Sequence, residues 1–166
     1  MKTIYIVRHG KSSWDDFNLS DHDRPLNKTG IKKTTRIVDY LKKKKVQPEL
    51  FVSSSAVRAK TTAFQIAEGL GYPIQKVVIE ESLYHAGEDD IFSALFGLPD
   101  GINSVMLFGH NPTLTDFVNN FLNPKIDNLP TTGVVSIVFK TDKWEKLAEA
   151  NFQLNFVVFP GMLKVR

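Results

Sequence analysis

Residues 4–10 read Ile-Tyr-Ile-Val-Arg-His-Gly, so that a run of four apolar residues ends abruptly in two polar side chains and a glycine. Such a continuous apolar run, rich in β-branched and aromatic residues, is typical of a central strand that is buried on both faces. Ligands of open α/β sheets bind beyond the carboxyl ends of the strands, so Arg8 and His9 should project into the ligand crevice. Gly10 lets the chain turn there and lets a ligand approach the backbone.

Length and composition predict one globular domain that spans residues 1–166. Apolar residues make up 42% and charged residues 23% of the chain, as in soluble proteins and unlike disordered or fibrous ones. No apolar stretch is long enough to cross a bilayer, and the first strand begins so close to Met1 that no room is left for a signal peptide. Cysteine is absent, which removes disulfides and thiolate nucleophiles. We therefore expect a cytoplasmic protein without a membrane partner.

The formal net charge of +3 is unevenly distributed. Through Lys45 the chain has twelve Lys or Arg and five Asp or Glu, a net of +7; the remainder has nine against thirteen, a net of −4. A positive field around the first strand end favours an anionic substrate. The lysine run 42–45 also fits the solvated end of a helix, where the helix dipole favours cations. The pI near 9.0 comes without a nucleic-acid-binding motif, so we expect no nucleic-acid partner.

Short apolar runs alternate with helical patterns along the chain, whereas residues 11–26 have no clear period and predict a loop beside the first strand end. Apolar spacing predicts helices over residues 27–44, 56–70, 88–98 and 112–122, and strands over residues 49–53, 76–79 and 103–108. Two late β-rich runs, 134–139 and 151–159, predict an antiparallel pair joined by a turn around 141–146. This order predicts a three-layer α/β/α fold whose central sheet is mostly parallel and has a late antiparallel strand.

Two of the predicted helices begin with residues that suit a helix N-terminus. Residues 88–90 are Glu-Asp-Asp, which the helix dipole favours in a first turn, and we interpret them as a cap and not as a metal site. Asn111 can cap the helix that follows it, and Pro112 suits the first helical position.

Polar side chains follow three of the predicted parallel strands. Arg8 and His9 follow the first strand, and His110 follows the strand that ends at residue 108. Arg58 lies in the first turn of the helix after the second strand. Because the carboxyl ends of parallel strands meet at one edge of a sheet, these four side chains should converge beside a helix N-terminus. Arginine grips two oxygens at once and a helix N-terminus presents unpaired N–H groups, so the grouping suits a phosphoryl group.

Histidine can itself attack phosphorus, because its reference pKa near 6.5 leaves much of it neutral at physiological pH. The product would be a covalent phosphohistidine, with arginines stabilising the charge on the transferred group. Taken singly, each of these residues has an ordinary structural explanation. His22 lies in a polar loop with nothing to pair it, and we assign it no role. His9 and His110 could share a zinc ion by residue type, but no third ligand has a recognisable spacing, so we expect no metal or other cofactor.

Three separated motifs resemble the histidine phosphatase superfamily, also called the phosphoglycerate mutase-like fold. They are Arg8-His9-Gly10, the segment Ser-Ser-Ala-Val-Arg-Ala-Lys-Thr-Thr-Ala at residues 54–63, and Gly109-His110-Asn111-Pro112. They occur in the family's order between Met1 and about residue 140. The short length and Asp23-Arg24-Pro25-Leu26-Asn27, followed by Gly30, look most like the SixA branch, the phosphohistidine phosphatases.

The resemblance implies roles for five residues. His9 would be the phosphorylated nucleophile, and Arg8, Arg58 and His110 would form the phosphate pocket. Ser12 lies in the turn where the family often places a hydroxyl that contacts phosphate. The same resemblance implies a metal-independent hydrolase of phosphoric monoesters or phosphoramidates.

The chain departs from the family where many members supply a carboxylic acid to protonate the leaving oxygen. The comparable stretch reads Glu81-Ser82-Leu83-Tyr84-His85, with histidine at the expected place of the acid. Loss of a general acid slows ester cleavage by about 10²- to 10⁴-fold, whereas the imidazole of a phosphohistidine leaves more easily. His85 or Glu81 could still serve as the proton donor, and both could equally be ordinary loop residues.

The preferred hypothesis is a phosphatase that acts through phosphorylated His9 on phosphohistidine of a protein. The alternatives are a small-molecule phosphomonoesterase on the same scaffold and a non-catalytic domain that binds phosphate or phosphoproteins. Only 51 residues separate Arg58 from His110, which leaves little chain for a lid, and an open pocket favours a protein substrate. A pure binder would have no need for the nucleophile.

Overall fold

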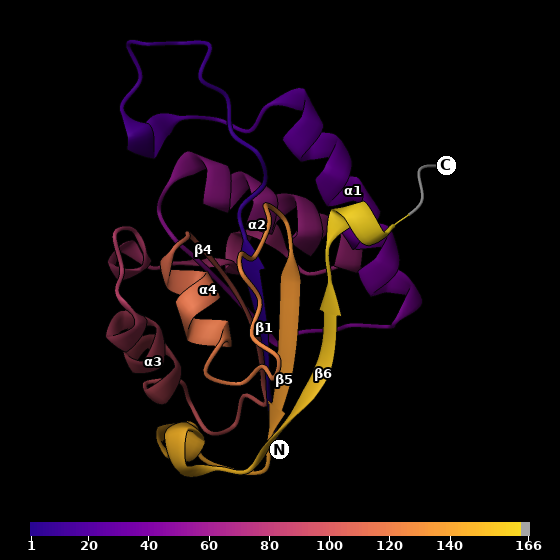
Figure 1. Cartoon of the computed structure of the whole chain (residues 1–166), viewed down its shortest axis with the longest axis vertical. Coiled ribbons are helices and arrows are strands. Elements are labelled where there is room, and N and C mark those ends of the chain that lie inside the picture. The colour runs from indigo at the N-terminus through magenta and orange to yellow at the C-terminus, as the bar shows by residue number, and fades with distance from the viewer. Residues whose placement is uncertain (164–166) are drawn as a thin grey trace.

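The structure is a computed structural model that describes residues 1–163. It consists of a six-stranded sheet with helices on both faces (Figure 1). The strands lie in the order β3-β2-β4-β1-β5-β6. Their bounds are β1 Lys2–Arg8, β2 Leu50–Ser53, β3 Val78–Ile79, β4 Ser104–Gly109, β5 Val134–Phe139 and β6 Phe152–Val158. Strands β1 to β4 are parallel to one another, and β5 runs antiparallel to both β1 and β6. This arrangement confirms the predicted three-layer fold and its late antiparallel strand.

The register of the central strands brings the polar strand ends to one level. Arg8 of β1 pairs with Gly109 of β4, and Ser53 of β2 pairs with Phe108 of β4. The residues that follow these three strands therefore emerge side by side at one edge of the sheet.

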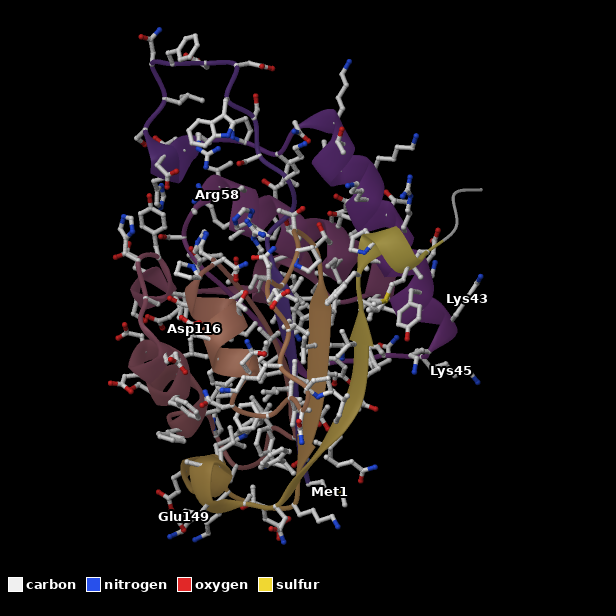
Figure 2. All side chains as sticks on the ribbon, in the orientation of Figure 1. Met1, Lys43, Lys45, Arg58, Asp116 and Glu149 are labelled. Carbon is white, nitrogen blue, oxygen red and sulfur yellow. The ribbon has the colours of Figure 1, made fainter. Side chains whose placement is uncertain are left out.

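Within residues 1–163, four α-helices cover the sheet: α1 Lys28–Lys43, α2 Val57–Leu70, α3 Glu88–Phe96 and α4 Thr113–Val118. Helix α1 begins at Asn27, whose side-chain oxygen accepts the Gly30 N–H at 2.7 Å. A Cβ on Gly30 would meet the backbone of Lys11, so only glycine lets α1 lie against the loop that follows His9. The lysine run lies at the far end of α1, where Lys43 and Lys45 are well separated from Arg58 (Figure 2). This position fits the solvated end of a helix.

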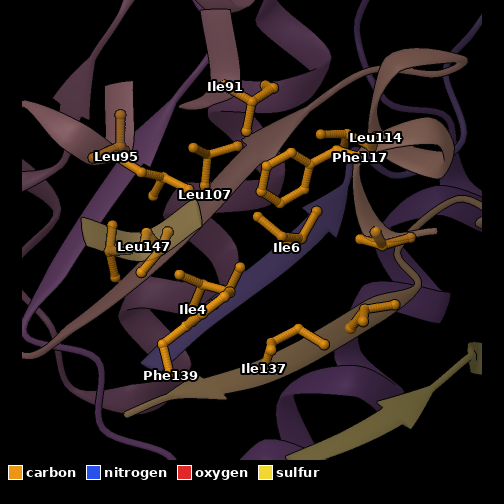
Figure 3. Packing of buried hydrophobic residues seen from close by; sticks show 14 of the residues in the cluster. Ile4, Ile6, Ile91, Leu95, Leu107, Leu114, Phe117, Ile137, Phe139 and Leu147 are labelled. Carbon is orange, nitrogen blue, oxygen red and sulfur yellow. The ribbon is translucent and has the colours of Figure 1, made fainter. Parts of the chain in front are cut away.

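Alternate residues of β1 pack into two separate hydrophobic clusters. Ile4 and Ile6 are fully buried on the face covered by α3 and α4, with Phe117 of α4 packed nearby (Figure 3). Tyr5 and Val7 are buried on the opposite face, against α1 and α2. Burial of each large apolar side chain stabilises the fold by roughly 1.5–3 kcal/mol. The central strand is thus held from both sides, which fixes the position of the residues at its end.

The main differences from the predicted elements concern three segments. The strand predicted over residues 76–79 is shorter, because Lys76 ends a 3₁₀ helix, Ile74–Lys76, and β3 is Val78–Ile79. Helix α4 ends at Val118, four residues before the predicted end, because the Asn119 side chain bonds both backbone groups of Ile126 and draws the chain into a loop. The connection between β5 and β6 is longer than the predicted turn and contains a 3₁₀ helix, Trp144–Glu149. Trp144 is fully buried and its indole N–H donates to the carbonyl of Ile102 at 2.8 Å.

Among residues 1–163, no helix is both long enough and apolar enough to span a membrane.

Candidate active site

The structure brings the four strand-end residues together. His9 follows β1 and His110 follows β4, and their ring centres lie 5.1 Å apart. Arg58 lies in the first turn of α2 and points its Nε at His9 Nε2, at 3.4 Å. Arg8 ends β1 beside them. The site lies where Arg58 is labelled, at the carboxyl end of the parallel strands (Figure 2).

His9 is held in one tautomer. Its Nδ1 lies 2.6 Å from the carbonyl of Gly10, and because a carbonyl only accepts, Nδ1 carries the proton and donates it. Nε2 therefore keeps its lone pair. The side chain is buried, and this burial lowers the pKa of His9 to about 3, with the neighbouring cationic groups adding to the shift. His9 is consequently neutral at physiological pH.

His110 is fixed through its other ring nitrogen. Nε2 lies 2.7 Å from the hydroxyl of Ser54, and that hydroxyl also accepts the N–H of Ala56 at 3.2 Å. Ser54 can thus donate its own proton to Nε2, which leaves a proton on Nδ1. Burial, followed by the charge of Arg58, lowers the pKa of His110 to about 4.

Two buried nitrogens beside His9 have no hydrogen-bond partner within residues 1–163. They are Nε of Arg8 and Nδ1 of His110. The Nη1 of Arg8 is satisfied by the carbonyl of Leu129 at 3.1 Å. A buried donor without an acceptor costs about 1–3 kcal/mol, so a pair of them marks a place where an acceptor binds. An oxyanion such as a phosphoryl group would satisfy both donors.

The loop of residues 11–26 adds an acidic residue that the sequence reasoning missed. The Asp21 carboxylate accepts from Arg58 at 3.1 Å, from Arg24 at 3.0 Å and from the hydroxyl of Tyr84 at 2.7 Å. The backbone carbonyl of Asp21 also accepts from Arg58, at 2.7 Å. The hydrogen bond from Tyr84 and the charge of Arg58 hold the pKa of the Asp21 carboxyl well below its usual range. Asp21 is therefore an ionised anchor for Arg58.

The sequence signal for Asp21 is its spacing of three residues from Arg24, next to the Asp23-Arg24-Pro25-Leu26-Asn27 segment. Those two side chains form an i,i+3 ion pair across a 3₁₀ turn, Asp21–Asp23. Nothing in the local pattern indicates the partner Tyr84, which lies 63 residues away.

Ser12 is connected to Arg58 by a chain of three hydrogen bonds. Its hydroxyl accepts from Nη1 of Arg24 at 2.7 Å, and Ser12 forms an isolated bridge with Leu26. Arg24 in turn bonds Asp21, so the structure links Ser12 to Arg58 through two side chains. A direct contact of Ser12 with phosphate stays a prediction.

A pocket of about 340 Å³ opens beside Arg58 and His110, and His9, whose ring centre lies 5.1 Å from that of His110, is not among the residues that line it. His85 and Tyr84 line it together with Arg58 and His110, and the rings of Tyr84 and His85 lie 4.0 Å apart. Glu81 is exposed and is not among the residues that line this pocket. The structure thus places one of the two predicted proton-donor candidates at the pocket and the other outside it.

His22 has partners, contrary to the sequence-based interpretation. Its Nδ1 lies 3.0 Å from a carboxylate oxygen of Asp23, and its Nε2 lies 3.0 Å from the hydroxyl of Ser55. The ring also packs edge-on against Tyr84, with centres 4.9 Å apart. His22 therefore helps to hold the loop against the start of α2.

Within the described part of the chain, no group of three or more His, Asp or Glu side chains is arranged to hold a metal ion.

Comparison with known sequences shows similarity to histidine phosphatases. Residues 4–84 match the model of the histidine phosphatase superfamily (branch 1). Phosphohistidine phosphatase SixA of Escherichia coli is 27% identical over 137 residues, which cover 81% of this chain and 83% of that protein. An uncharacterized chloroplastic protein of Arabidopsis thaliana is 33% identical over 119 residues, or 66% of this chain. The chain spans about half of the length of that relative, 54%.

Comparison with solved structures gives the same fold. The structure of a putative SixA phosphohistidine phosphatase from Agrobacterium tumefaciens superposes with a TM-score of 0.80 at 25% identity, covering 96% of this chain and 99% of that one. A SixA protein histidine phosphatase in complex with tungstate superposes with a TM-score of 0.81 at 24% identity, covering 98% and 99%.

Proposed function

We propose that this chain, which belongs to the histidine phosphatase superfamily, is a metal-independent phosphatase that passes the phosphoryl group of its substrate to His9 and then to water. The observation that carries the proposal is the unprotonated Nε2 of His9, which lies beside Arg58 and the two unsatisfied donors of Arg8 and His110. A nucleophile and a set of oxyanion donors thus meet at one point.

In the first step, the lone pair of His9 Nε2 forms a bond to phosphorus, and the bond from phosphorus to the leaving group breaks. The leaving group departs with that electron pair. The N–H groups of Arg58, Arg8 and His110 donate to the phosphoryl oxygens, whose charge they stabilise during transfer. In the second step, water attacks the phosphorus, the P–N bond to His9 breaks, and inorganic phosphate leaves with the protons of that water.

The ionised state of the pocket carboxyl favours cleavage of a phosphoramidate over cleavage of an ester. Asp21 is the carboxyl group among the residues that line the pocket, and its depressed pKa keeps it ionised, so it has no proton to give to an alkoxide. His85, which also lines the pocket, is the remaining candidate proton donor, and it is not a carboxylic acid. The imidazole of a phosphohistidine can carry a proton on its other ring nitrogen and leave as a neutral molecule. Phosphohistidine on a protein is therefore the proposed substrate, and a small phosphomonoester is the alternative.

The test compares phosphate release from a histidine-phosphorylated protein and from an aryl phosphate, without added metal, for wild type and His9→Ala. We expect faster cleavage of phosphohistidine by the wild type and no cleavage of either substrate by His9→Ala. Cleavage of the aryl phosphate alone would leave the chemistry intact and refute the substrate. Equal activity of His9→Ala and wild type would refute the nucleophile.

A further inference from the structure

The loop that follows His9 carries an exposed apolar tip. Trp14 is 69% exposed, Phe17 95% and Leu19 39%, all within six residues. Single exposed apolar residues are common on soluble proteins, but several on one short segment mark an interaction surface. We call Trp14, Phe17 and Leu19 the apolar tip.

The apolar tip has a defined base. Ser13 N–H donates to the carbonyl of Pro25 at 2.8 Å, and Asn27 N–H donates to the carbonyl of Lys11 at 2.9 Å, so the two ends of the loop are bonded to each other. At the tip, the side chain of Asp16 accepts the N–H of Asn18 at 2.9 Å. This local turn holds Phe17 out in solvent.

A chain of side-chain contacts connects the tip to the candidate active site. The guanidinium of Arg24 lies 3.5 Å from the ring centre of Trp14, and Arg24 also bonds Asp21. Asp21 in turn bonds Arg58, whose Nε points at His9. The loop projects beyond the carboxyl end of the sheet, on the same side of the molecule as Arg58 (Figures 1 and 2). A molecule that contacts the tip is thus next to the rim of the pocket.

We propose that the apolar tip is a docking surface for the protein that carries the phosphohistidine. This inference rests on the proposed function and deepens it. A pocket of about 340 Å³ accepts a phosphorylated side chain, and the tip offers further apolar area that only a macromolecular substrate could cover. The exposed acids Asp15 and Asp16 lie between Trp14 and Phe17. The complementary partner surface is therefore an apolar patch with Lys or Arg residues, close to its phosphorylated histidine.

The experiment compares two substrates with the same leaving group. One is free N-phosphohistidine, and the other is a small folded protein phosphorylated with phosphoramidate on one exposed histidine that has apolar and basic neighbours. The variant is Phe17→Ser, because the Phe17 side chain is almost fully exposed and its loss should leave the fold unchanged. The matched control is Leu154→Ser, which removes a 45% exposed apolar side chain from the edge strand β6.

We expect Phe17→Ser to lower kcat/KM for the phosphorylated protein about tenfold, the size of a substantial interface contact, and to cleave free phosphohistidine as the wild type does. Leu154→Ser should match the wild type on both substrates. Equal activity of Phe17→Ser and wild type on the protein would overturn the docking surface. A concentration-dependent dimer in sedimentation that Phe17→Ser abolishes would also overturn it, because a second copy would then cover the tip. If the wild type cleaves neither form of phosphohistidine, the proposed function itself fails.

Discussion

The candidate site has two halves that are built in different ways. The strand-end half consists of Arg8, His9 and His110, which the backbone register of β1 and β4 places side by side. The loop half centres on Asp21, which is held by side-chain bonds to Arg24, Arg58 and Tyr84. His9 is buried and Arg8 and His110 are partly buried, whereas Asp21 is exposed. The positions of His9 and His110 are therefore fixed by the strands, whereas the position of Arg58 also depends on polar contacts with a loop.

Removal of the proposed nucleophile, His9, from the strand-end half should have the largest effect. His9→Ala should lower kcat at least about 10⁴-fold, since no other group supplies the bond to phosphorus. After reaction with a ³²P-labelled substrate and rapid quenching, the wild-type protein alone should carry a ³²P label that is stable in base and lost in acid, as expected of phosphohistidine. The matched control is His22→Gln in the loop half, which should lose less than about tenfold. Similar losses for both histidines would erase the distinction.

The pH dependence of stability tests the burial of the same half. Burial lowers the pKa of His9 to about 3 and that of His110 to about 4, whereas an unfolded histidine titrates near 6.5. Below pH 6.5 the unfolded chain therefore binds protons that the folded chain does not, and the free energy of unfolding falls as pH is lowered. We expect a fall of about 3 kcal/mol between pH 6.5 and 5 in urea titrations.

The double variant His9→Gln with His110→Gln is the control for this measurement, because it removes both depressed groups. Its free energy of unfolding should change much less over the same pH range. A wild-type protein with constant stability between pH 6.5 and 5 would show that both histidines accept protons in the folded state.

Arg58 joins the two halves of the site, and its replacement tests how much activity depends on that connection. Arg58→Lys keeps the charge but loses the planar group that donates to His9 and to Asp21 at once. We expect kcat/KM to fall about 10²-fold, the loss typical of a removed oxyanion donor. Steady-state kinetics check this, with Lys60→Arg in the same helix as the control. Activity within twofold of wild type would show that charge alone suffices.

Asp21→Asn should have the smallest of these effects. It removes the negative charge that Arg58 and Arg24 share, so Arg58 is less well positioned while His9 and His110 stay in place. We expect kcat/KM to fall about tenfold and the free energy of unfolding to fall by about 1 kcal/mol. Hydrogen exchange of residues 11–26 should become faster. Asp23→Asn, which alters a neighbouring exposed carboxylate that contacts His22, is the control, and an equal effect of the two would contradict the anchoring role.

The sequence predicted the strand-end half well for a physical reason. The run of residues 4–10 indicates a buried strand followed by polar residues, and the same pattern recurs before His110. Parallel strands align their carboxyl ends. Two such runs therefore bring their last residues to one edge of the sheet, independently of the conformation of the loops between them. The repeated motif was thus enough to place Arg8, His9 and His110 together, and the position of Arg58 in the first turn of the next helix predicted that it would join them.

The loop half could not be predicted in the same way. Residues 11–26 have no apolar period, and the contacts of Asp21 with Tyr84 and of His22 with Ser55 join residues 63 and 33 positions apart. Side-chain hydrogen bonds over such separations leave no local pattern. For the same reason no sequence pattern distinguished His85 from Glu81 as a proton donor, and only the structure shows that His85 lines the pocket and Glu81 does not.

The sequence by itself determined the order of elements, the mostly parallel sheet and the four residues at the strand ends, because periodicity and strand alignment are local and general rules. Only the tertiary structure decided the early end of α4, the 3₁₀ helix before β6, the ionised anchor Asp21 and the exposed position of the apolar tip. These features depend on which distant groups satisfy each other's hydrogen bonds and on which apolar side chains find room in the core. Both are settled when the layers pack.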